Sequence, residues 1–298
     1  MPNPPVKLFD THAHFFTSDT GRYPVDLTGA REGAEAMMAR LENDPATGQR
    51  VLALWDESGV AGGAAVQYNT VYKTDNSYTV DVADAHRDRV SAVLILAAAD
   101  PATPETLRAI AERHNVSGLR LFGYPDGDGN YPWLDSPAAL ATWDVAAELG
   151  LNMVLMYAPG APSQAALQRI VALAKRYPDT AIALDHCGWP GVEGGLTGTI
   201  GPEHRKLVDV PNIHFKFTQI NFNRFAEAEI DPAEFVRLLV DSYGAGRVMW
   251  GSDYGNTKTT YPEMVRQAVE ATRLLEDGER EQVLYANGAR LFADRLNR

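Results

Sequence analysis

Short apolar runs alternate with longer amphipathic stretches along the whole chain, which is the pattern of repeated β-strand and α-helix units. Eight of the short runs are predicted strands. They cover residues 6–14, 62–67, 91–96, 116–122, 152–157, 181–186, 212–217 and 247–251.

The stretches between these runs carry the amphipathic pattern of helices. Predicted helices cover residues 49–59, 75–87, 104–114, 136–149, 162–177, 202–208, 231–243 and 261–276. A last helix, at residues 277–295, is expected to pack against the outside of the fold.

Eight strands that alternate with helices over a chain of 298 residues predict a (β/α)8 TIM barrel, with residues 1–298 forming one domain. The alternative is a doubly wound open sheet, which usually carries a glycine-rich phosphate-binding turn after its first strand. Here the first strand is followed by His12-Ala-His14-Phe-Phe, without such glycines, and this favours the barrel.

Residues suited to metal and proton chemistry fall at the ends of three predicted strands. Residues two apart on a strand face the same side, so His12 and His14 converge at the barrel mouth, where two imidazoles make a natural chelate for zinc. Asp253 follows the eighth strand and suits a metal ligand or a general base. The structural alternatives are a pair of histidines that cap the core and an aspartate that starts a turn.

The sixth strand ends in Asp185-His186, and neighbouring residues on a strand point to opposite faces. We therefore expect His186 to face the interior and Asp185 to support it from behind. Arg120 on the fourth strand, Tyr157 at the end of the fifth and Lys216 on the seventh are candidate pocket residues. Arg120 and Lys216 fit equally well as inward cations with a structural role.

The formal net charge of −12 argues against nucleic acid and anionic membranes as partners, whereas a small anionic substrate needs only a few local cations. Cys187 is the one cysteine, so no disulfide forms within the chain, and the N-terminus lacks an apolar signal core. A cytoplasmic location is the expectation. Trp133 and Trp189 fit pocket walls or a homo-oligomer interface, and the sequence leaves the oligomeric state open.

Three motifs, in order along the chain, resemble the amidohydrolase superfamily, in particular its family 2. They are Phe9-Asp-Thr-His-Ala-His14, Ala183-Leu-Asp-His-Cys-Gly-Trp-Pro190 and Met249-Trp-Gly-Ser-Asp-Tyr254, and residues 287–292 resemble the family's closing helix. The loop from Gln67 to Asn76 is similar to one in a lactone-hydrolysing branch, which includes 2-pyrone-4,6-dicarboxylate hydrolase, 4-sulfomuconolactone hydrolase and sugar-acid lactonases.

The resemblance implies roles for the matching residues. His12, His14, His186 and Asp253 correspond to a metal-binding or proton-transfer cluster, and Arg120 resembles an arginine that binds a substrate carboxylate. Thr74 and Asn76 are further pocket candidates, although Thr74 or Asp75 also suits the cap of the following helix. One divalent cation, with zinc as the expected identity, is implied, yet some lactonases of this branch work without metal.

The chain departs from two-metal amidohydrolases, because its fourth and fifth strands offer Arg120, Met156 and Tyr157 in place of a bridging ligand and a histidine. We expect a hydrolase that opens a small lactone, with Asp253 as general base. The alternatives are a metal-dependent decarboxylase of an aromatic or muconic acid and a non-catalytic barrel that binds small acids. Residues 17–45 and 189–202 form loops of unpredicted conformation, and the second is a candidate lid.

Overall fold

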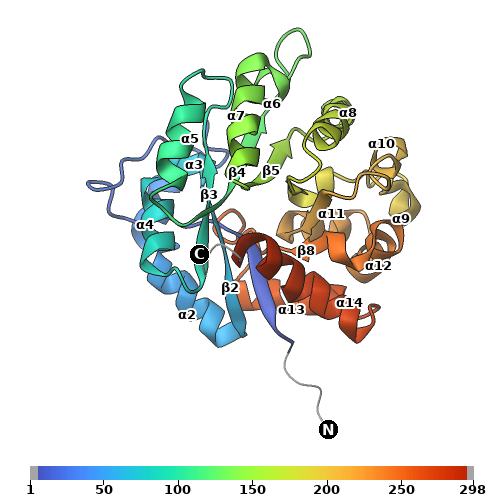
Figure 1. The fold of residues 1–298 in the computed structure, drawn as a ribbon. Coiled ribbons are helices and arrows are strands. Elements are labelled where there is room, and N and C mark those ends of the chain that lie inside the picture. Colours follow the sequence, from blue (N-terminus) through green and yellow to red (C-terminus); the bar gives the residue numbers. More distant parts are fainter. Residues whose placement is uncertain (1–5, 294–298) are drawn as a thin grey trace.

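A computed structural model describes residues 6–293, which form eight parallel strands surrounded by helices (Figure 1). Each strand pairs with the next along the chain, and a bridge between Ala13 and Tyr254 brings the first strand beside the last. The predicted TIM barrel is confirmed. The strands are β1 (Leu8–Ala13), β2 (Val60–Val66), β3 (Val90–Ile95), β4 (Val116–Gly123), β5 (Asn152–Tyr157), β6 (Ile182–Leu184), β7 (Ile213–Phe217) and β8 (Val248–Trp250).

Helices fill the connections between the strands, and several begin at the side-chain caps that their sequences provide. The Ser136 hydroxyl accepts from the Ala139 amide, and the Asp231 carboxylate accepts from the Ala233 amide. The longer helices are α1 (Ala34–Asn43), α2 (Gly48–Ser58), α4 (Ser77–Ala85), α5 (Thr103–Ala111), α7 (Pro137–Glu148), α8 (Ala161–Arg176), α11 (Gln219–Glu227), α12 (Pro232–Tyr243) and α13 (Tyr261–Ala271). The short ones are α3 (Asn69–Tyr72), α6 (Pro132–Asp135), α9 (Gly195–Gly198), α10 (Pro202–Arg205) and α14 (Asp277–Glu281).

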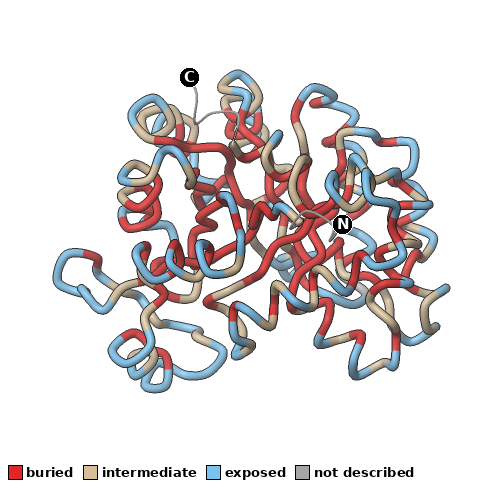
Figure 2. Tube along the Cα trace, turned by 90° about the horizontal axis from the view of Figure 1, so that it is seen from below, coloured by how far each residue is buried: buried red, intermediate tan, exposed pale blue. Residues whose placement is uncertain are grey.

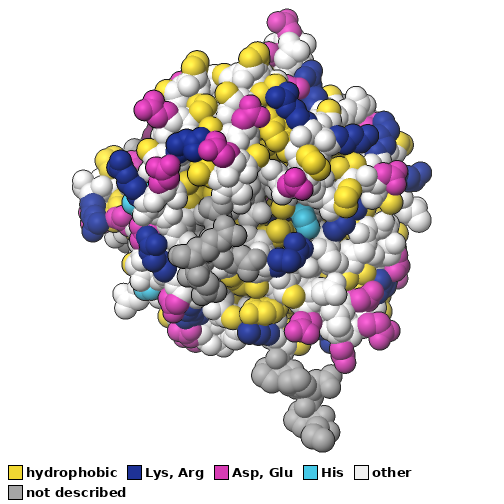
Figure 3. All heavy atoms as spheres, in the orientation of Figure 1, with side chains coloured by type: hydrophobic (Ala, Val, Ile, Leu, Met, Phe, Trp, Pro, Cys, Tyr) yellow, Lys and Arg dark blue, Asp and Glu magenta, His cyan; other side chains and the backbone are white. Residues whose placement is uncertain are grey.

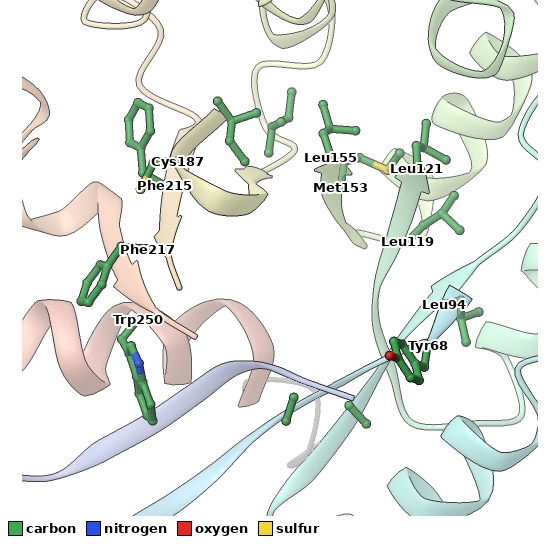
Figure 4. Close-up of a cluster of buried hydrophobic side chains, with 14 of the residues drawn as sticks. Tyr68, Leu94, Leu119, Leu121, Met153, Leu155, Cys187, Phe215, Phe217 and Trp250 are labelled. Carbon is green, nitrogen blue, oxygen red and sulfur yellow. The ribbon is translucent and has the colours of Figure 1, made fainter. Parts of the chain in front are cut away.

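The core has two layers, because alternate residues of each strand face the barrel interior and the helices. The interior layer is small and consists of Phe9, Ala64, Val66, Val93, Val154, Ala183, Met249 and Phe292. The outer layer is much larger and lies between strands and helices, where Figure 4 shows Leu119, Met153, Phe215 and Trp250 among others. Figure 2 shows the strands buried at the centre and the exposed positions on the surrounding helices and loops.

The C-terminal segment differs from the prediction. Residues 277–295 were expected to form one helix on the outside, but α14 continues into two π-helical turns, Gln282–Ala286 and Ala289–Ala293. Phe292 packs into the interior layer, and the Asn152 amide donates to the Leu291 carbonyl at the start of β5. The segment therefore closes the end of the barrel where strands begin, and the opposite end remains for a site. Residues 294 and 295 lie outside the described part.

Acidic and basic side chains are interspersed over the face of the molecule in Figure 3. Among the described residues, no helix combines the length and the apolar character needed to cross a bilayer.

Candidate active site

Two histidines at the C-terminal end of β1 share one face of the chain, as residues two apart on a strand do. Their rings are nearly perpendicular, with centroids 4.9 Å apart. The Nδ1 atom of His14 lies 2.9 Å from the Val66 carbonyl, and Nδ1 of His12 lies 3.1 Å from Oδ1 of Asp185. Both partners accept hydrogen bonds, so each Nδ1 carries the proton and each Nε2 keeps a lone pair for a ligand.

Asp253 reaches the same centre from the loop after β8. Its backbone N–H donates to the His12 carbonyl at 2.7 Å, and its φ is 57°, in the left-handed region. Gly251 permits the close approach of the two strand ends, because a Cβ there would lie 2.5 Å from Cβ of His12. Asn256 donates to Oδ2 of Asp253 at 3.0 Å. The carboxylate is thus held with its Oδ1 directed at the two histidines.

These three side chains have the composition and spacing of a metal site. Oδ1 of Asp253 lies 3.3 Å from Nε2 of His14 and 3.5 Å from Nε2 of His12. One ligand atom from each residue falls within 4.8 Å of the others. Nε2 of His12 and Oδ1 of Asp253 are buried without a hydrogen-bond partner in the described chain, which is costly unless an ion or a water occupies the centre. Two imidazoles and one carboxylate fit a divalent cation such as zinc.

Burial and charge set the protonation states that such a site needs. Burial lowers the pKa of His12 to about 3, so the imidazole is neutral at neutral pH. Burial raises the pKa of Asp253, but the imidazoles around it, His14 foremost, outweigh this effect and hold the pKa below its ordinary value. The centre therefore combines neutral His12 with an ionised carboxylate.

Asp185 lies on the interior side, contrary to the prediction that it would point away. Strand β6 ends at Leu184, and residues Asp185–Gly188 form a 3-10 turn in which His186 and Cys187 have φ of 53° and 56°. Strand alternation therefore does not apply, and both Asp185 and His186 reach the interior. Asp185 was missed as a functional residue, although the two inward cations Arg120 and Lys216 already required a buried acid.

Asp185 joins four buried groups. Besides holding His12, it accepts from Nε of Arg120 at 2.8 Å and lies 3.5 Å from Nζ of Lys216. Burial raises its pKa, but His12, Lys216 and Arg120 outweigh burial and hold the pKa well below the ordinary range. Arg120 is thus paired with a barrel acid, one of its two predicted roles, and it also lines the pocket described below.

His186 lies beside the three-residue centre. Its ring centroid is 5.9 Å from that of His12, and its Nδ1 is 2.7 Å from the Thr218 hydroxyl. The Asn221 amide donates to the His186 carbonyl at 3.0 Å and so secures the left-handed turn. Burial lowers the pKa of His186, which favours the neutral ring. Of the four predicted ligands, the structure brings His12, His14 and Asp253 together and places His186 at the pocket wall.

A cavity of about 390 Å³ opens above this centre at the C-terminal ends of the strands. Its walls include His14, His186, Arg120, Tyr68 and Trp189, and Tyr68 stacks on His14 at 4.7 Å between centroids. The remaining lining residues are Thr28, Gly29, Arg31, Asn69, Thr70, Lys73, Phe122, Tyr124, Met156, Ile220 and Asn256. Sequence reasoning missed Arg31 and Lys73, because both lie on loops with no regular pattern.

Tyr157 does not line this cavity. It shares the outward face of β5 with Met153 and Leu155, while Met156 takes the pocket position. The Tyr157 hydroxyl is buried without a hydrogen-bond partner in the described chain, and a Cβ at Gly188 would lie 2.6 Å from it. The predicted pocket role therefore moves by one residue along the strand.

Three other predicted pocket residues also lie elsewhere. Lys216 is fully buried within the barrel, where burial lowers its pKa. Asn76 is structural, because its amide donates to the Ile95 carbonyl at 2.9 Å and its Oδ1 accepts from the Ile95 amide at 2.9 Å. Thr74 lines an adjoining apolar cavity of about 290 Å³ together with Trp133.

The fold and this centre are those of a metal-dependent hydrolase barrel, and comparison with known families agrees. The family model described as amidohydrolase matches residues 9–293, so the chain belongs to the amidohydrolase family.

Among characterised relatives, an L-fucono-1,5-lactonase from Burkholderia ambifaria is 26% identical over 200 residues. That match covers 66% of each chain, just under two thirds of the relative's length.

Solved structures share the fold over nearly the whole chain. A probable 2-pyrone-4,6-dicarboxylic acid hydrolase from Acinetobacter baumannii, with citric acid bound, has a TM-score of 0.71 and 20% identity over 96% of this chain and 98% of that one. A zinc-bound amidohydrolase from Burkholderia multivorans has a TM-score of 0.70 and 18% identity over 96% and 99%. A 2,6-dihydroxybenzoate decarboxylase with its substrate has a TM-score of 0.69 and 15% identity over 96% and 97%.

Proposed function

We propose that this protein hydrolyses the lactone ring of a small carboxylated or sugar-acid substrate at the centre formed by His12, His14 and Asp253. The observation that carries the proposal is the convergence of these three ligand atoms, two of them buried and unpaired, beneath a cavity that also contains Arg120. The similarity to a fuconolactonase and to the fold of a pyrone-dicarboxylate hydrolase supports lactones as the substrate class.

One divalent cation, for which we propose zinc, fits between Nε2 of His12, Nε2 of His14 and Oδ1 of Asp253, since these atoms are unprotonated lone-pair donors within 4.8 Å of one another. When bound, such a cation polarises a carbonyl and lowers the pKa of a water molecule. The unpaired state of two of these atoms favours this reading over metal-free catalysis.

Asp253 is the proposed general base. Its carboxylate is ionised, and Asn256 occupies Oδ2, so Oδ1 accepts the proton of a water molecule. The water oxygen adds to the lactone carbonyl carbon, the ring C–O bond breaks, and the proton passes to the leaving oxygen. A positioned base of this kind contributes about 10²–10⁴-fold to the rate.

Arg120 and His186 are the proposed substrate-contacting residues. The guanidinium of Arg120 is oriented by Asp185 through Nε, which leaves its other nitrogens for a substrate carboxylate. His186 is anchored through Nδ1 by Thr218, so its Nε2 is available to the carbonyl oxygen as negative charge develops there.

Asp253→Asn tests the proposal most simply. Asparagine tolerates the left-handed backbone of residue 253, so the fold is expected to persist while lactone turnover falls by at least about 10²-fold. The assay uses a broad lactone panel, with metal content and the melting temperature measured on the same samples. Near-normal turnover in the variant would end the assignment of Asp253.

A decarboxylase is the second candidate, because the 2,6-dihydroxybenzoate decarboxylase fold matches about as well as that of the lactone hydrolases. Carbon dioxide release from aromatic acids, measured beside lactone opening with and without a chelator, separates the two. Binding of acids without any turnover would instead indicate a non-catalytic barrel.

A further inference from the structure

The cavity above the centre is electropositive in a strongly acidic protein. The chain carries 39 acidic and 27 basic residues, yet the described lining includes Arg31, Lys73 and Arg120 and no Asp or Glu. Arg120 has a buried partner in Asp185, whereas no ion pair with a carboxylate of the described chain involves Lys73. The pKa of exposed Asp26 is lowered mainly by the Thr28 amide, and Lys73 contributes least to this shift.

Lys73 also has an unusual backbone conformation. Its φ is 50° and its ψ is −115°, a combination that side chains with a Cβ rarely adopt and that glycine adopts without strain. Strain of this kind persists only where the surroundings enforce it, and it is concentrated at functional sites. The position thus keeps a side chain where the backbone geometry favours none.

The enforcing contacts come from the fully buried Gln67 at the end of β2. Its Nε2 donates to the carbonyl oxygens of Lys73 at 3.2 Å and Asp75 at 2.6 Å, and its Oε1 accepts from the Thr79 hydroxyl at 2.5 Å. The lysine Nζ donates once, to the Thr70 carbonyl at 3.2 Å, which leaves two of its three N–H groups for a ligand.

We propose that Lys73 is a specificity-determining residue that binds a second anionic group of the substrate, separate from the group held by Arg120. The two cations stand on different walls of the cavity, one after β2 and the other on β4, so a substrate with carboxylates on two sides of its ring contacts both. Gln67 acts as a positioning residue for Lys73. This inference rests on the proposed function, since it defines the substrate class of the same site.

The test uses rigid probes that bind metals poorly. Benzoate, isophthalate and terephthalate differ in the number and placement of carboxylates, and calorimetry measures their binding to the metal-loaded protein. We expect wild type to bind at least one dicarboxylate more tightly than benzoate. Lys73→Met should weaken that dicarboxylate by about 10-fold, as for a lost hydrogen bond between charged groups, and change benzoate binding by less than about twofold.

Two further variants separate charge from backbone and from overall electrostatics. Lys73→Gly should lose the same dicarboxylate affinity without a lower melting temperature, because it removes the strain together with the charge. Lys258→Met removes an exposed lysine outside the cavity and should leave all three affinities unchanged.

Three results would overturn the inference: equal binding of benzoate and both dicarboxylates by wild type, an unchanged affinity ratio in Lys73→Met, or an equal loss in Lys258→Met. Lactone turnover is measured separately. If lactones are opened but Lys73 has no effect, this inference alone fails; if Lys73 discriminates but no lactone is opened, the proposed function alone fails.

Discussion

Asp185 lies 3.1 Å from Nδ1 of His12, so a fully buried carboxylate orients the histidine that faces Asp253. The same carboxylate neutralises Arg120, and Lys216 lies 3.5 Å away. One acid therefore links the orientation of a proposed metal ligand to the stability of the barrel interior.

Asp185→Asn should weaken both functions. Loss of an acceptor behind a ligating histidine typically lowers metal affinity by about 10–100-fold. Breaking a buried ion network by removing one partner costs about 3–5 kcal/mol of stability, because Arg120 and Lys216 remain as buried charges. Zinc competition titrations and denaturant unfolding measure the two effects.

The double variant Asp185→Asn, Lys216→Met is the matched control. It removes one of the two orphaned cations and should recover part of the lost stability but none of the lost metal affinity. Unchanged metal affinity in Asp185→Asn would contradict the orienting role.

His14 and His186 should behave differently when each is replaced by asparagine. His14→Asn removes one of the three clustered ligand atoms, so bound zinc should fall well below one per chain. His186→Asn keeps a residue that tolerates φ of 53° and leaves the three atoms in place, so the metal should stay while kcat falls. Elemental analysis and steady-state kinetics decide this, and loss of metal in both variants would favour a four-ligand site.

Tyr157→Phe should leave kcat and KM within about twofold of wild type. The hydroxyl it removes is buried without a partner in the described chain and lies on the helix side of β5. Because an unpaired buried hydroxyl costs stability, unfolding free energy should stay the same or rise by up to about 1–3 kcal/mol. A marked rise in KM would return Tyr157 to the pocket.

His214 should make the protein sensitive to acid. It lies on β7 near the barrel bottom, and burial lowers its pKa to about 3 from an ordinary value of 6.5. Since the unfolded chain binds the proton more readily, this stability is complete above pH 6.5 and is lost as the pH falls from 6.5 toward 3. The loss is about 1.4 kcal/mol per pH unit.

His214→Leu should therefore lose about 2 kcal/mol less than wild type between pH 6.5 and 5. Denaturant unfolding at the two pH values measures the difference. The same pH dependence in both proteins would show that His214 titrates normally in the folded state.

The barrel could be predicted from the sequence because its strands are short apolar runs, and each is recognisable locally. The proximity of His12, His14 and Asp253 then follows from the fold, since parallel strands bring their C-terminal ends to one mouth. Local pattern failed where the backbone leaves regular geometry. Asp185 lies in a 3-10 turn, where strand alternation no longer decides which side chain faces inward.

Other residues depended on tertiary packing. Phe292 looked like part of an outer helix, but it fills the barrel interior at the closed end. Lys73 lies on a loop whose conformation is fixed by Gln67, and no pattern in the sequence indicates that contact. The choice between Met156 and Tyr157 depended on the phase of a single strand at its last residues.

The central claim is that His12, His14 and Asp253 together bind a catalytic metal ion, and an anomalous-difference map of zinc-loaded crystals tests it most directly. The account predicts a peak about 2.0–2.2 Å from Nε2 of both histidines and from Oδ1 of Asp253. Full lactone turnover in chelator-treated protein, together with no peak at this centre, would contradict it.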